Sequence, residues 1–212
     1  MSSIAERHLF MPFQLVYRVV IPTSIRTELV RKSIHMLVAL VPVAAAVNLG
    51  ITMALLAAGT LIYTYAEALR CRGTKVVLIS RLTAMASRER DLGRFVLGPV
   101  TLGLGAMLAL LLYPAPAASI AVFALAFGDG LASLIGKLFG RIQIPHTGGK
   151  TIVGSAACFA AVFFSAYLIT ADTGAAFVIA LVATAVEMLP LRDLDNILMP
   201  LSAGSTALFF LP

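Results

Sequence analysis

Four ionisable residues lie inside long apolar stretches of this sequence. Asp129 is flanked by glycines in the segment 127–130. The other three residues lie within apolar runs of their own: Glu67, Glu187 and His35. Asp129 lies about six residues, hence roughly 9 Å, inside the predicted end of its helix. Because an ionisable group costs free energy in an apolar environment, such a residue usually has a function. An internally paired, structural carboxylate is the alternative for Asp129.

A segment rich in glycine and cations follows Asp129, between Gly136 and Thr151. Its backbone N–H groups and Lys150 can bind phosphate oxygens, and the next helix would present its N-terminus there. It is not a Walker A loop, because Ile144 occupies the position of the first glycine of that motif. A plain loop, with glycines that only allow helix packing, is the alternative. We predict that phosphates are bound by Lys137, Gly140, Arg141, Gly148, Gly149, Lys150 and Thr151.

Oxygen ligands recur before the last apolar run, in Asp193, Asp195 and Asn196. Mg²⁺ takes a few carboxylate ligands and completes its shell with water and phosphate oxygens. Asp193 can pair with its neighbour Arg192, which makes Asp195 the better candidate ligand. The sequence therefore predicts an Mg²⁺ site of Asp129 and Asp195, with Asn196 beside the nucleotide.

Two further residues are candidates for proton transfer. Glu187 is predicted either to support the site or to act as a general base, and a helix-end charge is its alternative. His35 shares a helical face with Arg31 and Lys32, and a structural role is its alternative. The predicted catalytic residues are therefore Asp129, Lys150, Glu187 and His35.

The composition is that of a membrane protein. The 212 residues are 60% hydrophobic and 12% charged, with a mean hydropathy of +0.98, whereas soluble domains are roughly 45–50% apolar. The net charge of +6 is explained by cations beside membrane spans, so we expect no nucleic-acid partner. Cys71 and Cys158 are widely separated and predict neither a disulfide nor a metal site.

The apolar runs predict an all-α, polytopic transmembrane bundle. About seven runs are long enough to be candidate spans. We expect an N-terminal interfacial segment over 1–30 and a transmembrane catalytic domain over 31–212. The short spans and glycine-rich faces are compatible with a homodimer. The predicted spans are 33–49, 51–69, 94–113, 115–135, 152–170, 173–190 and 196–211.

The distribution of charge predicts the orientation. With a cytoplasmic N-terminus, all 16 Lys and Arg residues fall on the inner side, and the outer connections carry only Asp172. The positive-inside rule therefore favours a site facing the cytoplasm, in the inner membrane of a prokaryote. The basic segment 70–94 has apolar residues at helical spacing and is expected to lie on the membrane surface, in contact with lipids.

Several segments resemble the membrane superfamily of CTP-using enzymes. The central match is the segment 127–141 followed by 150–155, and the weaker matches are 31–35, 98–99 and 195–200. The superfamily unites phosphatidate cytidylyltransferases with CTP-dependent kinases of dolichol, phytol, farnesol or diacylglycerol. The elements typical of the cytidylyltransferase branch, Gly-His-Gly-Gly and an Asp-Arg-x-x-Asp-like motif, are not found here.

The resemblance implies a kinase that transfers the γ-phosphoryl group of CTP to a lipid alcohol such as a polyprenol, dolichol or phytol. It implies that Asp129 and Asp195 lie near Mg²⁺ and that Lys150 binds phosphate. A cytidylyltransferase acting on a lipid phosphate is the first alternative. A small transporter is the second, although its polar residues would be spread across the bilayer, whereas here they gather toward one face.

Overall fold

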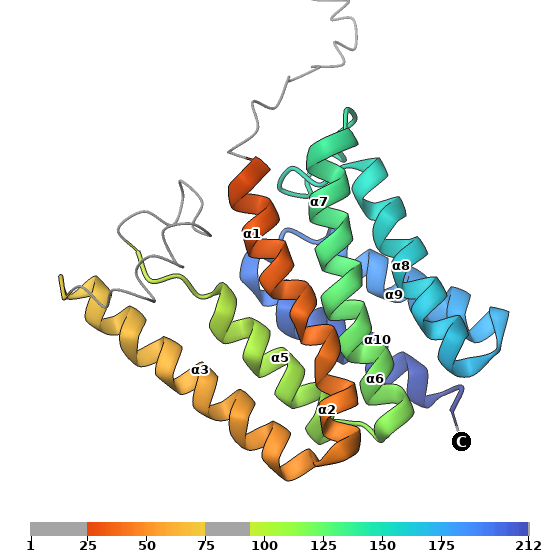
Figure 1. Ribbon diagram of the computed structural model, residues 1–212. Coiled ribbons are helices and arrows are strands. Elements are labelled where there is room, and N and C mark those ends of the chain that lie inside the picture. The colour runs from red at the N-terminus through yellow and green to blue at the C-terminus, as the bar shows by residue number, and fades with distance from the viewer. Residues whose placement is uncertain (1–24, 75–93, 212) are drawn as a thin grey trace, which may run out of the picture.

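The computed structural model describes residues 25–74 and 94–211 as a bundle of helices (Figure 1). Within these ranges the only β-type pairing is an isolated bridge between Gln143 and Thr151. The all-α prediction is therefore confirmed. Most of the expected interfacial segment 1–30, and residues 75–93 of the expected surface helix, lie outside the described residues.

The described helices follow the predicted apolar runs in order. Each run coincides with one helix, or with helices joined by a single irregular turn. The elements are α1 (Ile25–Met36), the 3₁₀ turn η1 (Leu37–Leu40), α2 (Val41–Val47), α3 (Leu49–Cys71), α5 (Gly98–Leu112), α6 (Ala115–Phe123), the π-helix η3 (Ala124–Asp129), α7 (Gly130–Phe139), α8 (Ile152–Thr170), α9 (Thr173–Met188), the 3₁₀ turn η4 (Arg192–Leu194) and α10 (Asp195–Leu208).

Four of these helical stretches are long and apolar enough to cross a membrane. They are Thr27–Val47, Leu49–Cys71, Ala115–Phe139 and Ile152–Thr170, and α5 and α9 are shorter apolar helices. These helices indicate a membrane protein. The count of seven spans and the cytoplasmic N-terminus stay predictions.

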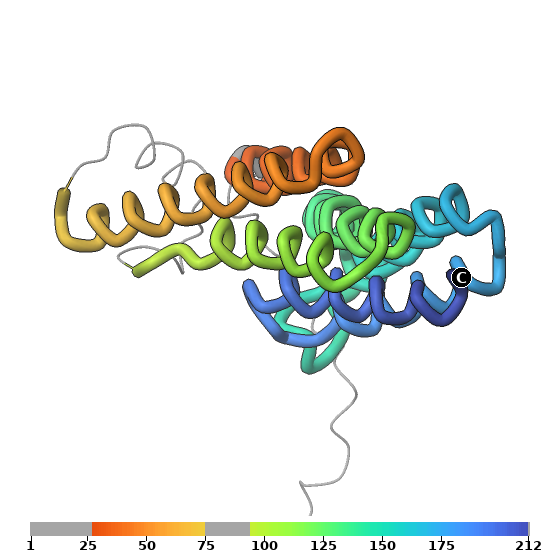
Figure 2. The backbone as a smooth tube through the Cα atoms, turned by 90° about the horizontal axis from the view of Figure 1, so that it is seen from below, coloured from red at the N-terminus to blue at the C-terminus, as the bar shows by residue number. Residues whose placement is uncertain are grey.

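Helix α6, η3 and α7 form one continuous rod through the middle of the bundle. Figure 2 shows it between the α1–α3 side and the α9–α10 side, and this rod contacts α1, α5, α8 and α10. Its buried surface combines small residues such as Ala117 and Ala121 with the larger Ile120 and Leu125. Other large apolar side chains such as Leu55 and Leu168 point outward, 69% and 83% exposed. Small residues between helices and large ones outside are typical of helices that pack within lipid.

Gly105 marks a close approach between α5 and α10. A Cβ atom there would lie 2.0 Å from the backbone oxygen of Asn196, whereas a Cβ at Gly59 on α3 would meet no atom within 4 Å. We expect Gly105→Ala to lower the free energy of unfolding by about 3 kcal/mol, the upper range for overpacking. Gly59→Ala is the matched control and should change it by no more than about 1 kcal/mol. Thermal unfolding of both variants in detergent tests this contact, and equal melting temperatures would contradict it.

Candidate active site

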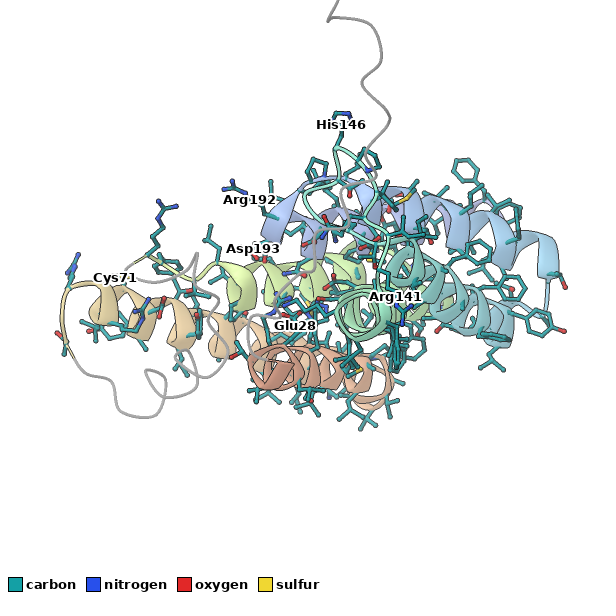
Figure 3. The ribbon with its side chains drawn as sticks, turned by 90° about the horizontal axis from the view of Figure 1, so that it is seen from above. Glu28, Cys71, Arg141, His146, Arg192 and Asp193 are labelled. Carbon is teal, nitrogen blue, oxygen red and sulfur yellow. The ribbon has the colours of Figure 1, made fainter. Side chains whose placement is uncertain are left out.

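A cavity of about 1300 Å³ opens at one end of the bundle, where α7 ends and α8 begins. Figure 3 looks onto this end, with Glu28 and Asp193 toward the middle of the view and Cys71 at the far end of α3. His146 lies at the tip of the loop between α7 and α8, pointing away from the helices. Of the predicted site residues, those that line the cavity are Asp129, Lys137, Gly140, Arg141, Gly148, Gly149, Lys150, Thr151, Glu187, Asp195 and Asn196.

Asp129 is the last residue of the π-helix in the central rod. Short π-helical segments often occur at functional sites, because the extra residue redirects the side chains that follow it. The Asp129 side chain reaches the cavity yet the residue is only 5% exposed. Lys32 of α1 forms an ion pair with its Oδ2 atom, and Lys32 is 1% exposed. Asp129 is therefore paired internally with a buried lysine, as the structural alternative predicts, and its functional role stays a prediction.

His35 supports Asp129 from the side of α1. Its Nε2 atom lies 2.8 Å from the Leu125 carbonyl oxygen of the π-helix and 3.2 Å from Oδ2 of Asp129. A carbonyl oxygen only accepts hydrogen bonds, so Nε2 must carry a hydrogen. His35 is not among the residues that line the cavity. Its geometry thus favours the structural alternative over the catalytic role.

Lys150 joins two carboxylates on the opposite wall of the cavity. Its Nζ atom lies 2.8 Å from Oε1 of Glu187 and 3.7 Å from Oδ2 of Asp195. Ser155 of α8 donates a hydrogen bond of 3.0 Å to the other carboxylate oxygen of Glu187. Burial alone would lower the pKa of Lys150, but Glu187, Asp129 and Asp195 together raise it, so the ammonium group stays charged.

Asp195 is a largely buried carboxylate of the cavity. Burial, and next the charge of Asp129, raise the pKa of Asp195 to about 6, against the opposing effect of Lys150. A carboxyl group raised in this way ionises more readily when another cation comes near it. Asp129 and Asp195 line the same cavity, and their joint role as metal ligands stays a prediction.

The loop between α7 and α8 positions Lys150 as a tight hairpin. The Ile144 N–H donates to the Lys150 carbonyl oxygen at 2.9 Å, and Gly148 and Gly149 adopt φ angles of +72° and +99°, which favour glycine. Thr151 caps α8 by accepting a hydrogen bond from the Gly154 N–H at 3.1 Å. The glycines are therefore required by the turn, whether or not they also approach a phosphate.

Glycines at the end of α7 serve helix packing. A Cβ atom at Gly136 would lie 2.8 Å from Thr151 Oγ1, and one at Gly140 would lie 2.5 Å from the same atom. The small side of α7 thus lets the start of α8 come close, which was the packing alternative for this pair. Lys137 in the last turn of α7 and Arg141 just after the helix both line the cavity.

Asn196 connects α10 to α5. Its Nδ2 atom donates to Thr101 Oγ1 at 2.9 Å and to the Gly98 carbonyl oxygen at 3.3 Å. The side-chain donors of Asn196 therefore bind α5, and the predicted role in nucleotide binding stays a prediction. Glu67 is likewise engaged, because it accepts from Arg70 at 2.7 Å and from the Val96 N–H at 2.9 Å.

Three residues of the site were not predicted as functional from the sequence. Lys32 was recognised only as a neighbour of His35 on one helix face, Ser155 only as the end of the matching segment 150–155, and Glu28 carried no signal. Glu28 lies one helical turn before Lys32, a spacing that places both on one side of α1. Both turn out to be almost fully buried.

Comparison with known proteins gives one distant similarity. A probable chloroplastic phytol kinase from Triticum aestivum is 34% identical to this chain over 91 residues. The match covers 35% of this chain and 30% of the plant protein. The similarity indicates a distant relationship to lipid-alcohol kinases. No family model matches the chain, and no solved structure matches it.

Proposed function

We propose that this protein is a membrane-embedded kinase that transfers the γ-phosphoryl group of CTP to a lipid alcohol of the polyprenol, dolichol or phytol type. The observation that carries the proposal is the cavity itself, in which Asp129 of the central membrane helix and Lys150 of the connecting loop line the same space. A charged nucleotide needs the polar end of the bundle, and a lipid hydroxyl needs a site close to the bilayer. We place this end of the bundle at the cytoplasmic face, where the nucleotide is available.

The proposed cofactor is an Mg²⁺ ion. Asp129 and Asp195 offer hard oxygen ligands and line one space. In residues 25–74 and 94–211, no three His, Cys, Asp or Glu side chains are grouped closely enough to hold a metal by themselves. An Mg²⁺ site commonly has one or two carboxylates, with water and phosphate oxygens as the other ligands. When bound there, Mg²⁺ would neutralise charge on the transferred phosphoryl group.

The protein's own residues have two tasks in this reaction. The bond between the γ-phosphorus and the bridging oxygen of CTP breaks, the hydroxyl oxygen of the lipid bonds to phosphorus, and CDP leaves. Lys150 would hold the phosphate oxygens in place, which is the main requirement of phosphoryl transfer. The hydroxyl proton would pass to a carboxylate, Asp129 or Glu187, because Nε2 of His35 already carries a hydrogen bonded to a carbonyl oxygen.

An apolar side of the same cavity supports an amphiphilic acceptor. It is formed by the residues before α5 and by the connection between α9 and α10. These two segments are held close to each other by the hydrogen bond from Asn196 of α10 to the carbonyl oxygen of Gly98, the first residue of α5. This side would receive the hydrocarbon chain while the hydroxyl group points toward Asp129. The apolar lining residues are Phe95, Leu97, Leu189, Pro190, Leu191 and Leu194.

Transfer of label from CTP tests the proposal directly. The purified protein is incubated in liposomes with Mg²⁺, phytol, farnesol and phosphatidate, using CTP labelled at either the γ- or the α-phosphate. We expect label from the γ position in the lipid fraction and none from the α position. Removal of Mg²⁺ with EDTA should abolish the transfer, because the phosphate charge is then not neutralised.

Two results would overturn the proposed function. Label from the α position would establish cytidylyl transfer to a lipid phosphate. No labelled lipid from either position, for a protein that is folded and reconstituted, would exclude a CTP-dependent kinase of these acceptors. Parallel reactions with γ-labelled ATP separate the choice of nucleotide from the chemistry.

A further inference from the structure

A buried carboxylate on α1 holds a group of cavity-lining side chains. Glu28 is 1% exposed and is not itself part of the lining. Arg31 donates from Nη2 to Oε1 of Glu28 at 2.6 Å, Ser133 of α7 donates to the same oxygen, and Lys137 of α7 forms an ion pair with Oε2. Arg31, Ser133 and Lys137 all line the cavity. Glu28 therefore stands behind this wall and joins α1 to α7.

Arg31 has a hydrogen-bond donor that the described part of the chain leaves without an acceptor. Its Nε atom is buried, and none of the described residues accepts a hydrogen bond from it. A buried donor without a partner is unfavourable and calls for an explanation such as a ligand or water. Because Nη2 is held by Glu28, the guanidinium plane has a defined orientation, with Arg31 facing the cavity. An oxyanion bound beside Arg31 would give Nε an acceptor once the side chains that cover this atom move aside.

The charge of this wall also favours an anion. Among Arg31, Lys137 and Glu28 there is one positive charge in excess. The carboxylates of Asp129 and Asp193 also lie close enough to attract Arg31. Bidentate or closely paired N–H donors on a positive group suit phosphate oxygens well. Helix α7 lies between α1 and α8 (Figure 1) and packs against both. The group around Glu28 is therefore on the α1 side of α7, whereas Lys150 precedes α8 on its other side.

We infer that Arg31 and Lys137, positioned by Glu28, form a second phosphate-binding subsite of the cavity, distinct from the one at Lys150. The inference rests on the proposed function, which places phosphate groups in this cavity. The ligand is a phosphate oxyanion. Two sources fit this chemistry: the polyphosphate chain of the nucleotide, and the phosphate head group of the lipid product.

Equilibrium binding separates the two sources without requiring catalysis. The probes are labelled CTP, CDP, CMP and farnesyl monophosphate, and the proteins are wild type, Arg31→Met and Arg31→Lys. Arg72→Met is the matched control, because Arg72 is exposed at the end of α3 and does not line the cavity. We expect Arg31→Met to weaken CTP and CDP binding roughly tenfold or more, the scale of a charge-assisted hydrogen bond. CMP should be affected less, since it lacks the distal phosphates.

Arg31→Lys distinguishes a hydrogen-bonding role from charge alone. It keeps the positive charge but loses the Nε donor, so it should recover only part of the affinity. If Arg31→Met instead weakens only farnesyl monophosphate, the subsite takes the lipid phosphate. If all four probes bind Arg31→Met as tightly as they bind Arg72→Met, the subsite does not exist. A wild-type protein that binds CTP but labels no lipid would refute the kinase and leave the subsite standing.

Glu28 has its own test as a positioning residue. Glu28→Gln retains an oxygen that can accept from Arg31 and Ser133 but loses the charge that holds Lys137. We expect turnover to fall roughly tenfold, because phosphoryl transfer depends on orientation of the phosphate. CTP affinity should not weaken, because the wall becomes more positive. If turnover and CTP affinity both fall in proportion to the loss of folded protein, the role of Glu28 is merely structural. If turnover is unchanged, Glu28 does not position the phosphate-binding side chains.

Discussion

Replacing Asp129 by asparagine is expected to reduce turnover at least about a hundredfold, the scale of losing one preorganised electrostatic group. The amide keeps the shape of the side chain but removes the charge that the proposed metal site requires. Turnover is measured as transfer of γ-label from CTP to lipid at saturating substrate. A folded Asp129→Asn protein with near-normal turnover would exclude Asp129 from the metal site.

The buried lysine makes a second variant necessary. Lys32 is almost fully buried against Asp129, so Asp129→Asn leaves an unpaired charge in the bundle, which typically costs about 3–5 kcal/mol of stability. The double variant Lys32→Met/Asp129→Asn removes both charges and should recover most of the thermal stability. It should nevertheless stay inactive. Stability and turnover that recover together would show that the aspartate serves only to pair Lys32.

The helices were predictable because apolar length is a strong local signal. Every predicted run became helical. Asn48 and Asp172 cap α3 and α9 in two of the connections that the sequence predicted to be free of Lys and Arg. The division of the first run was harder to foresee. A 3₁₀ turn precedes α2, where Pro42 lacks an N–H and crowds the preceding turn. The π-helix that carries Asp129 has no sequence signature, since it depends on how the rod packs against its neighbours.

The members of the site were easier to predict than their partners. Asp129 and Glu187 were identified because charge inside an apolar run needs a reason, and Lys150 because it follows two glycines in a cation-rich connection. Their contacts depend on the rotation of one helix against another, which a single sequence does not encode. Lys32 meets Asp129 across 97 positions, and Glu28 meets Lys137 across 109. The roles of those two α1 residues, and of His35 as a donor to a carbonyl, emerged only from packing.

Lys150→Ala is expected to lower kcat/KM for CTP at least about a hundredfold, because the cavity loses the cation proposed to hold the phosphate oxygens. The Lys150 side chain is 26% exposed, so the fold should survive the change better than it survives loss of Asp129. Lys150→Arg should keep part of the rate because it keeps the charge. Arg72→Ala, which removes an exposed cation outside the cavity, should retain the wild-type rate.

A double-mutant cycle separates phosphate binding by Lys150 from its pairing with Glu187. Suppose that Lys150 acts only by neutralising the Glu187 carboxylate. In a Glu187→Gln protein, where this carboxylate is replaced by a neutral amide, Lys150→Ala should then cause no further loss of kcat/KM. We expect the opposite result: a further loss of at least about tenfold in kcat/KM, because contact with a phosphate does not depend on Glu187. Initial rates of label transfer at several CTP concentrations give the four values of the cycle. Full coupling between the two changes would assign Lys150 to the carboxylate network and leave phosphate binding to the α1–α7 wall.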